Sequence, residues 1–308
     1  GTGGLFERSL TSADVLSSSQ AIALAHGASL PNIEFMQMMP GFIEPKRNLV
    51  FNEKTWRYVH VDQPVDIADG KLNDLLEQRS GYGPFTSRLA SRAIDLVIDQ
   101  VQRAWRSTTT SPARTSPSLC RPLPPGCKTS TASRRPTRCA WRCMPTPPTA
   151  VSKSTRPRTQ ALRASTPAVR QQAACTAPTA SANGIVFGRI AGASAAQAAL
   201  DAPEAAAPMD IALPQHGIAT ADAERLTRCL KRTMSTYCMI NRTEAGLSKA
   251  LQQLESLQDD ATALSKPHAN DSEIAALARL QSQIQLAQEM VKAMRKRTES
   301  LGSHYRAN

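Results

Sequence analysis

Five of the seven cysteines fall in one stretch of the chain, and clustered cysteines are the usual sign of a zinc site. They are Cys120, Cys127, Cys139, Cys143 and Cys175. A structural zinc site needs four ligands, usually two C-x-x-C pairs or cysteines with a nearby set of histidines. Neither pattern surrounds Cys139 and Cys143. The sequence therefore predicts no metal site.

The histidines offer no better candidates for ligands or catalytic bases. His26 and His60 each stand alone in the sequence. His304 lies near the end of the chain, where a packed or exposed side chain is commoner than a ligand. We assign no chemistry to these three residues on the sequence alone.

The cysteine-rich stretch also accounts for the basic character of the chain. The net charge of +12 would by itself indicate a nucleic acid or an anionic membrane surface as a partner. Residues 101–183, however, hold 14 Lys and Arg and no Asp or Glu. The remainder has 23 basic and 25 acidic residues and is slightly acidic. We therefore predict that nucleic acid is not a partner.

The same stretch is predicted to be disordered over residues 105–183. Twelve of the 21 prolines lie within 101–183, and no apolar period of 2 or 3.6 persists there. Such a segment cannot bury enough apolar surface to offset the entropy lost when the chain becomes ordered.

The elements on either side of this stretch can be predicted from apolar spacing and from breakers. Helices are predicted at 21–25, 72–78, 87–103, 221–239, 243–264 and 271–298, and strands at 32–38 and 56–61. Gly27, Pro40–Gly41 and Pro267 are the expected breakers. A glycine-punctuated apolar run covers 184–192, and 201–217 reads as a linker. We predict no transmembrane helix and no signal peptide, and a start without methionine suggests an N-terminally truncated fragment.

Six segments, in the same order, resemble motifs of the fumarate reductase, succinate dehydrogenase and L-aspartate oxidase flavoprotein family. They are Thr2–Gly4 (A-T-G-G), 33–40 (E-F-x-Q-F-H-P), 87–94 (R-D-x-x-x-R-A-I), 186–192 (V-F-G-R-x-A-G), 241–247 (the start of a C-terminal helix) and 297–306 (R-x-E-S-R-G-A-H-x-R). The resemblance covers about 1–104 and 184–308.

The resemblance implies a fold of three parts. These are a partial α/β FAD-binding domain, an α+β capping domain that interrupts it, and an all-α C-terminal three-helix domain. The implied boundaries are 1–45 and 184–200 for the FAD-binding domain, 46–104 for the capping domain, 105–183 for the anomalous segment and 218–308 for the helical domain.

The resemblance also implies the roles of individual residues. In the family, a capping-domain arginine at this place protonates the substrate carbon while the flavin delivers hydride, and the resemblance assigns that role to Arg88; the role needs a cation beside a carboxylate. The alternative for Arg88 is a solvent-exposed helix arginine without a catalytic role. Thr2, Gly3 and Gly4 lie where the family contacts FAD. Gly184 and Ile185 would begin a helix whose N–H groups face the flavin, and helix packing is the alternative for them.

Several family features are missing. The N-terminal G-x-G-x-x-G fingerprint, which places the pyrophosphate on a helix N-terminus, is absent. Ser17–Ser19 stands where the family has G-D-G. Met39 replaces the substrate histidine and cannot donate a hydrogen bond.

A reading-frame error would explain the anomalous segment. Read in a shifted frame with permitted codons, residues 168–182 can give G-G-E-A-A-G-G-V-H-G-A-N-R-L-G, the family motif expected directly before 186–192. We hypothesise that the frame shifts near 103–115 and returns near 181–184.

Three functional hypotheses follow. The first is an FAD-dependent oxidoreductase acting on a dicarboxylate or related small acid, inactive as written. It would be cytoplasmic, or peripheral to a membrane through an iron–sulfur electron-transfer subunit, with no span of its own. The second is a non-catalytic remnant whose helical domain folds or binds a partner. The third, ranked last, is a basic nucleic-acid binder, whose binding would weaken steeply with salt.

Overall fold

The computed structural model consists of two compact units. Its described residues are 2–9, 15–16, 18–44, 49–61, 67, 70–100, 105–109, 137–146, 180–201 and 214–307. The first unit consists of Gly1–Met38 and Pro145–Asn308, and the second of Met39–Met144. Most of the predicted linker 201–217 and of the anomalous segment lies outside the described residues.

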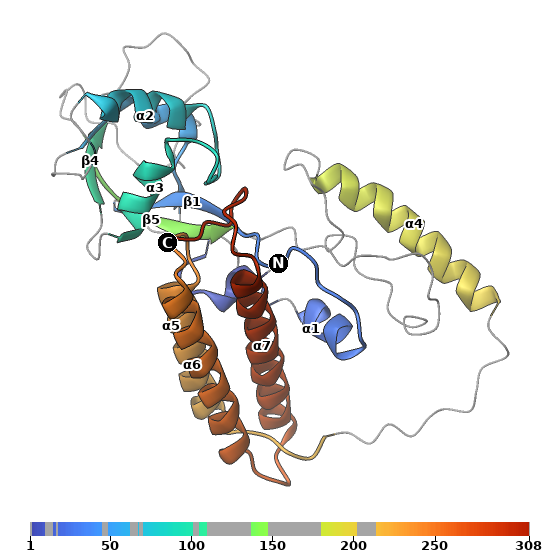
Figure 1. Cartoon of the computed structure of the whole chain (residues 1–308). Helices are drawn as coiled ribbons and strands as arrows, with labels where there is room; N and C mark the ends of the chain where they lie inside the picture. The colour runs from blue at the N-terminus through green and yellow to red at the C-terminus, as the bar shows by residue number, and fades with distance from the viewer. Residues whose placement is uncertain are drawn as a thin grey trace, which may run out of the picture. The chain divides into compact units, whose positions relative to one another are not determined.

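Three long helices form the centre of the first unit (Figure 1). They are α5 (Thr220–Tyr237), α6 (Glu244–Ala263) and α7 (Asp271–Lys296), and each packs against the other two. Their limits agree within two residues with the predicted helices, which confirms the C-terminal three-helix domain. Leu247, Leu254 and Leu257 of the predicted apolar stripe are buried. Burial of such stripes is the main source of helix stability in a bundle.

Side-chain caps fix where two of these helices begin. The Asn270 side chain accepts a hydrogen bond from Glu273 N, and the Glu273 carboxylate accepts one from Asn270 N, which is a complete capping box. Thr243 caps α6 by accepting from Gly246 N at 3.1 Å. The helix starts are therefore set by local chemistry as well as by packing.

The N-terminal segment packs on this bundle. The short 3₁₀ helix η1 (Gly3–Leu5) contacts α5, and α1 (Ser18–Ala25) contacts α7. The helix predicted at 21–25 is confirmed, with three further residues at its start. Gly27 follows it at φ +81°, a left-handed conformation that suits glycine and ends the helix.

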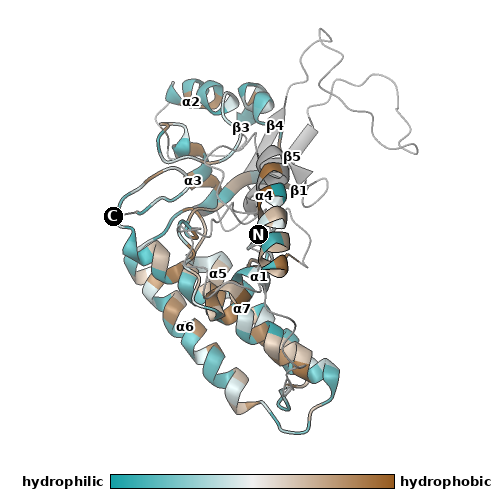
Figure 2. Ribbon diagram, turned by 90° about the vertical axis from the view of Figure 1, so that its right-hand side faces the viewer, coloured by the Kyte–Doolittle hydropathy of each residue, from teal (hydrophilic) through white to brown (hydrophobic). Residues whose placement is uncertain are grey.

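Helix α4 (Ala180–Leu200) belongs to the first unit and is rich in alanine. The prediction that order returns at residue 184 was wrong by four residues, because one continuous helix includes Ala180. Its apolar side chains Val186, Ile190 and Leu200 are exposed. Figure 2 shows apolar and polar residues interspersed along the helix.

The second unit contains most of a five-stranded sheet with the strand order β2-β1-β5-β4-β3. The strands are β1 (Gln37–Glu44), β2 (Leu49–Val50), β3 (Val59–Val61), β4 (Trp105–Thr109) and β5 (Thr137–Thr146). Pairs β1–β2, β3–β4 and β4–β5 are antiparallel. Two helices accompany the sheet, α2 (Lys71–Ser80) and α3 (Arg92–Gln100), together with the 3₁₀ helix η2 (Glu53–Tyr58).

The prediction of disorder was wrong for residues 105–109 and 137–146. These residues form β4 and β5, and the register places Trp105 opposite Trp141. Strand pairing depends on main-chain hydrogen bonds to a distant partner strand, so it needs no apolar period within either segment.

Three other predicted elements start or end elsewhere. Strand β1 begins at Gln37 and continues through Pro40–Gly41, because the Pro40 carbonyl still accepts from Phe51 N at 3.0 Å. The strand predicted at 56–61 is a 3₁₀ helix followed by three strand residues, and Trp56 is wholly buried in that helix. The helix predicted from residue 87 begins at Arg92, after a turn.

Candidate functional site

Segments from three of the family-like motifs meet in the first unit. Glu34 lies just before β1, Arg242 lies between α5 and α6, Arg297 ends α7, and His304 lies in the C-terminal turn. Glu34, Arg242 and His304 are buried. We call these four residues the motif cluster.

A partly buried ion pair joins the two sides of the cluster. Arg297 Nε donates to Glu34 Oε1 at 2.7 Å. The Arg297 guanidinium also lies over the Phe35 ring, 4.8 Å from its centroid, which is a cation–π contact. The carboxylate is 5 % exposed and the guanidinium 32 %, so the pair is screened by water from one side only.

Arg242 holds the cluster together through neutral acceptors. Its Nε donates to the Met239 carbonyl at 2.8 Å, and its Nη1 donates to the Glu34 carbonyl at 2.9 Å and lies 2.6 Å from His304 Nδ1. His304 Nε2 lies 3.0 Å from the Arg297 carbonyl. Because arginine can only donate, His304 is the neutral tautomer with its proton on Nε2.

The electrostatics of the cluster keep His304 neutral. The pKa of His304 is lowered to about 4, mainly by burial and then by the nearby Arg242 charge, while the hydrogen bond to the Arg297 carbonyl opposes the shift. Both ring nitrogens are engaged, so this histidine is not a free base. The motif cluster therefore ties the C-terminal turn to the segment before β1.

The predicted FAD contacts Thr2, Gly3 and Gly4 are all buried in the first unit. Gly4 N donates to the Val15 carbonyl at 3.0 Å, which fixes the turn. The hydroxyl of Thr2 is buried and has no hydrogen-bond partner among the described residues. A buried polar atom without a partner costs about 1–3 kcal/mol, so it marks a place where another polar group fits.

Gly184 and Ile185 are placed differently from the prediction. They lie in the second turn of α4, because the helix begins at Ala180. The N–H of a residue in the second turn is already bonded to the carbonyl four residues earlier. These N–H groups are therefore used within the helix, and the prediction that the two residues begin a helix was wrong.

Arg88 lies in the second unit, in the turn between α2 and α3. The guanidinium is exposed, and Arg88 N donates to Thr86 Oγ1 at 3.4 Å. The side chain thus projects from a turn and is not a helix residue. It is available to an anionic ligand.

Arg79 and Asp95 were missed by sequence reasoning. They form a buried bidentate ion pair, with Nε–Oδ2 at 2.9 Å and Nη2–Oδ1 at 3.1 Å, between α2 and α3. The only signal in the sequence was an aspartate between Ile94 and Ile98 on an apolar helix face. Burial raises the pKa of the Asp95 carboxyl, and the Arg79 charge opposes that shift.

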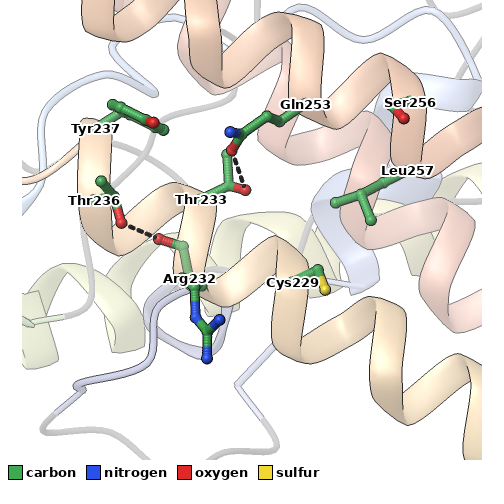
Figure 3. A pocket seen from close by; sticks show the side chains of 8 residues that line it. All are labelled: Cys229, Arg232, Thr233, Thr236, Tyr237, Gln253, Ser256 and Leu257. Carbon is green, nitrogen blue, oxygen red and sulfur yellow. Dashed lines mark hydrogen bonds between the residues drawn. The ribbon is translucent and has the colours of Figure 1, made fainter.

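A shallow hollow between α5 and α6 is lined mainly by polar side chains (Figure 3). Its volume is about 350 Å³. Two of the lining hydroxyls are engaged within the bundle, since Thr233 donates to Gln253 Oε1 at 2.8 Å and Thr236 to the Arg232 carbonyl at 2.8 Å. Arg232 also lies 3.7 Å from the Glu7 carboxylate. These contacts are internal to the protein and do not point to a ligand.

The described residues contain neither a metal-binding cluster nor a membrane-spanning helix. Within those ranges no group of three or more His, Cys, Asp and Glu side chains is arranged to hold a metal ion. Burial raises the pKa of the Cys238 thiol to about 12, which makes it inert. Cys120, Cys127 and Cys175 lie outside the described ranges. None of the described helices is long and apolar enough to cross a bilayer.

Comparisons with known proteins match the C-terminal part of the chain in sequence and the whole chain in fold. Residues 227–308 match the family model described as the fumarate reductase flavoprotein C-terminus. No curated protein matches the chain in sequence. Among solved structures, a quinol–fumarate reductase with menaquinol is similar with a TM-score of 0.60 and 15 % identity, over 100 % of this chain and 59 % of that one.

Two further structures show the same fold. A point mutant of E. coli quinol fumarate reductase has a TM-score of 0.64 at 15 % identity, again over 100 % of this chain and 59 % of that one. The Mycobacterium smegmatis Sdh1 complex has a TM-score of 0.66 at 17 % identity, over 100 % of this chain and 54 % of that one. The chain thus spans a little over half the length of these flavoproteins. The fold is that of the fumarate reductase and succinate dehydrogenase flavoproteins, and residues 227–308 of this chain match the family model of the fumarate reductase flavoprotein C-terminus.

Proposed function

We propose that the chain derives from an FAD-dependent oxidoreductase that acts on a dicarboxylate or a related small acid. The observation that carries this proposal is the motif cluster together with the family match. The segment around Glu34 lies outside the matched residues 227–308, yet it is bound by Arg242 and Arg297 from inside them. The two segments that resemble family motifs are therefore joined by direct hydrogen bonds in this structure.

Arg88 is the proposed catalytic residue. Its exposed guanidinium can bind a substrate carboxylate through paired hydrogen bonds and can also supply a proton to a developing carbanion. Met39 stands where the family has a substrate histidine, and a thioether donates no hydrogen bond. The proposed substrate class is therefore small acids with at least one carboxylate, and not fumarate in particular.

The proposed cofactor is FAD, and the described residues fit it in part. The buried Thr2 hydroxyl without a partner, next to Gly3 and Gly4, suits a polar atom of a cofactor. Gly184 and Ile185 do not offer free N–H groups, so a contact from them would be through packing. When bound, the flavin would supply the hydride. The residues of this chain would bind and orient the acid and hold the proton at Arg88.

The proposed partner is an iron–sulfur electron-transfer subunit, through which the protein would be peripheral to a membrane. This proposal is supported by the resemblance and by the similarity to quinol–fumarate reductase and to an Sdh1 complex. We do not propose nucleic acid as a partner.

The test of the proposed function combines flavin binding with the coding DNA. Purified protein is titrated with FAD, followed by flavin fluorescence, and is then assayed for fumarate reduction with an artificial electron donor. The DNA for residues 95–190 is resequenced in parallel. Flavin binding and an Arg88→Ala variant that loses turnover would support the proposal. No flavin binding by a chain with a corrected frame would overturn it.

A second function is favoured by one observation on the first unit. Helices α5, α6 and α7 carry their own apolar core and their own caps. A non-catalytic remnant whose helical domain still folds would therefore remain stable. It predicts cooperative unfolding of the helical region and no bound flavin.

A further inference from the structure

Arg88 is carried by a loop, residues 81–91, which we call the Arg88 loop. Helices α2 and α3 lie on either side of it. Phe85 and Thr86 of the loop are buried, whereas Arg88 is exposed. The backbone of the loop is therefore packed while the guanidinium faces solvent.

Two side chains from the last turns of α2 hold the ends of this loop. The Arg79 guanidinium donates through Nη1 to the Tyr82 carbonyl at the start. Gln78 Oε1 accepts from Ser91 N at 2.8 Å at the end. One helical turn thus fixes both ends of the loop that carries Arg88.

A third side chain holds the centre. Arg92, the first residue of α3, donates through Nη1 to the Ser87 carbonyl at 3.2 Å and lies 3.5 Å from the Leu89 carbonyl. These carbonyls belong to the residues on either side of Arg88. The backbone at Arg88 is therefore restrained from both directions.

Arg79 does more than neutralise a buried charge. Two of its nitrogens bind Asp95, so α2 and α3 are clamped together, and the third reaches the loop. Its guanidinium also lies 5.6 Å from the Trp56 ring centroid, which restrains its position. A planar guanidinium with five donors can make all these contacts at once, whereas a lysine cannot.

We propose that Arg79 is a positioning residue for Arg88, acting through the Arg88 loop. This inference rests on the proposed function, because it assigns a purpose to the presentation of Arg88. A binding group must be held within roughly 0.5 Å of its productive position by residues that are themselves locked. Arg79, locked by Asp95 and Trp56, meets that requirement.

The chain offers a variant that separates positioning from simple stability. The double substitution Arg79→Met with Asp95→Leu removes both buried charges together, and such replacements by apolar residues often leave stability unchanged. It also removes the hydrogen bond to the Tyr82 carbonyl. Arg57→Gln is the matched control, because Arg57 is near α2 and pairs with Glu77 at 3.4 Å but is well exposed.

The experiment compares the full chain with Arg88→Ala, the double variant, the double variant carrying Arg88→Ala, and Arg57→Gln. Amide hydrogen exchange is measured for residues 83–91, and succinate affinity by calorimetry. Tryptophan fluorescence gives the midpoint of unfolding of the second unit, since all three tryptophans lie there.

If Arg79 positions Arg88, the double variant keeps its unfolding midpoint, exchanges the loop amides at least tenfold faster, and binds succinate as weakly as Arg88→Ala. Adding Arg88→Ala to the double variant then has no further effect. Wild-type loop exchange and affinity in the double variant would overturn the positioning role alone. Unchanged affinity in Arg88→Ala by itself would overturn the proposed role of Arg88, and the positioning role with it.

Discussion

Glu34 and Arg297 are 263 residues apart in the sequence, and their side chains are joined by a 2.7 Å hydrogen bond. The bond links the segment before β1 to the residue that directly follows α7. Two stretches that resemble separate family motifs are therefore one structural feature. The two stretches depend on each other, because loss of Arg297 leaves the buried Glu34 charge uncompensated.

Glu34→Gln is expected to lower the free energy of unfolding of the first unit by about 1–3 kcal/mol, since a partly exposed partner limits the loss. Urea unfolding followed by far-UV circular dichroism measures this change, because the long helices dominate that signal. The control is Asp222→Asn, which removes an exposed pair with Arg225 and should change stability by less than about 0.5 kcal/mol. Equal effects from the two substitutions would contradict a special role for Glu34.

The stability of the first unit is expected to fall as the pH drops from about 6.5 to 4. The folded pKa of His304, about 4, lies below the ordinary value of 6.5, so the unfolded chain takes up a proton first. The contribution of the neutral His304 ring to the free energy of unfolding is therefore fully present above pH 6.5. It is lost as the pH falls towards 4, which lowers the free energy of unfolding by roughly 2–3 kcal/mol. His304→Gln should flatten the pH profile in that window, whereas His268→Gln, on an exposed loop, should leave it unchanged. An identical slope in the two variants would exclude His304 as the group responsible.

The helices were the part of the fold most open to prediction. Residues 221–298 show apolar spacing of 3.6, with Pro267 between two of the helices, so each helix is determined by nearby residues. The start of α3 was missed because Thr86 and Gln78 satisfy backbone N–H groups of the preceding turn. Such side-chain competition leaves no mark on the apolar period.

The sheet and the candidate site could be predicted only in part. Strands β4 and β5 pair across 27 intervening residues. The spacing of apolar residues within each strand does not indicate which distant strand it will pair with. The motif residues Glu34 and Arg297 were found through resemblance, but their contact was not. Arg79 and Asp95 were missed, because two charged residues 16 positions apart give no sign in the sequence that they will be buried together.

Asn270→Ala is expected to destabilise the first unit by about 1 kcal/mol. The substitution removes the side-chain acceptor for Glu273 N and opens the capping box, leaving a backbone donor without its partner. Ser272→Ala serves as the control and should have little effect, because Ser272 lies two residues after Asn270 in the first turn of α7 and is exposed. Both variants can be measured by urea unfolding with helical circular dichroism. A smaller loss for Asn270→Ala than for the control would show that the cap is not needed.

Gly217→Ala is expected to destabilise the same unit by about 1–3 kcal/mol, because there is no space for a methyl group. An added Cβ would lie 2.5 Å from Ala269 Cβ, 2.6 Å from Glu273 C and 2.7 Å from Ile274 N, and two of these atoms are backbone that cannot turn aside. Gly217 also exchanges two main-chain hydrogen bonds with Lys266, at 2.9 and 3.0 Å, so the approach of the two segments is close on both sides.

The control is Gly192→Ala, which is expected to raise the free energy of unfolding where Gly217→Ala lowers it. Gly192 lies inside α4, and an added Cβ would meet no atom within 4 Å. Alanine there should stabilise the helix by roughly 0.5–1 kcal/mol, because it loses less backbone entropy on folding. Thermal unfolding of the two variants beside the wild type distinguishes the effects. A Gly217→Ala variant as stable as Gly192→Ala would mean that the segment at Gly217 can move away from α7, and that the close packing at the start of that helix is not required.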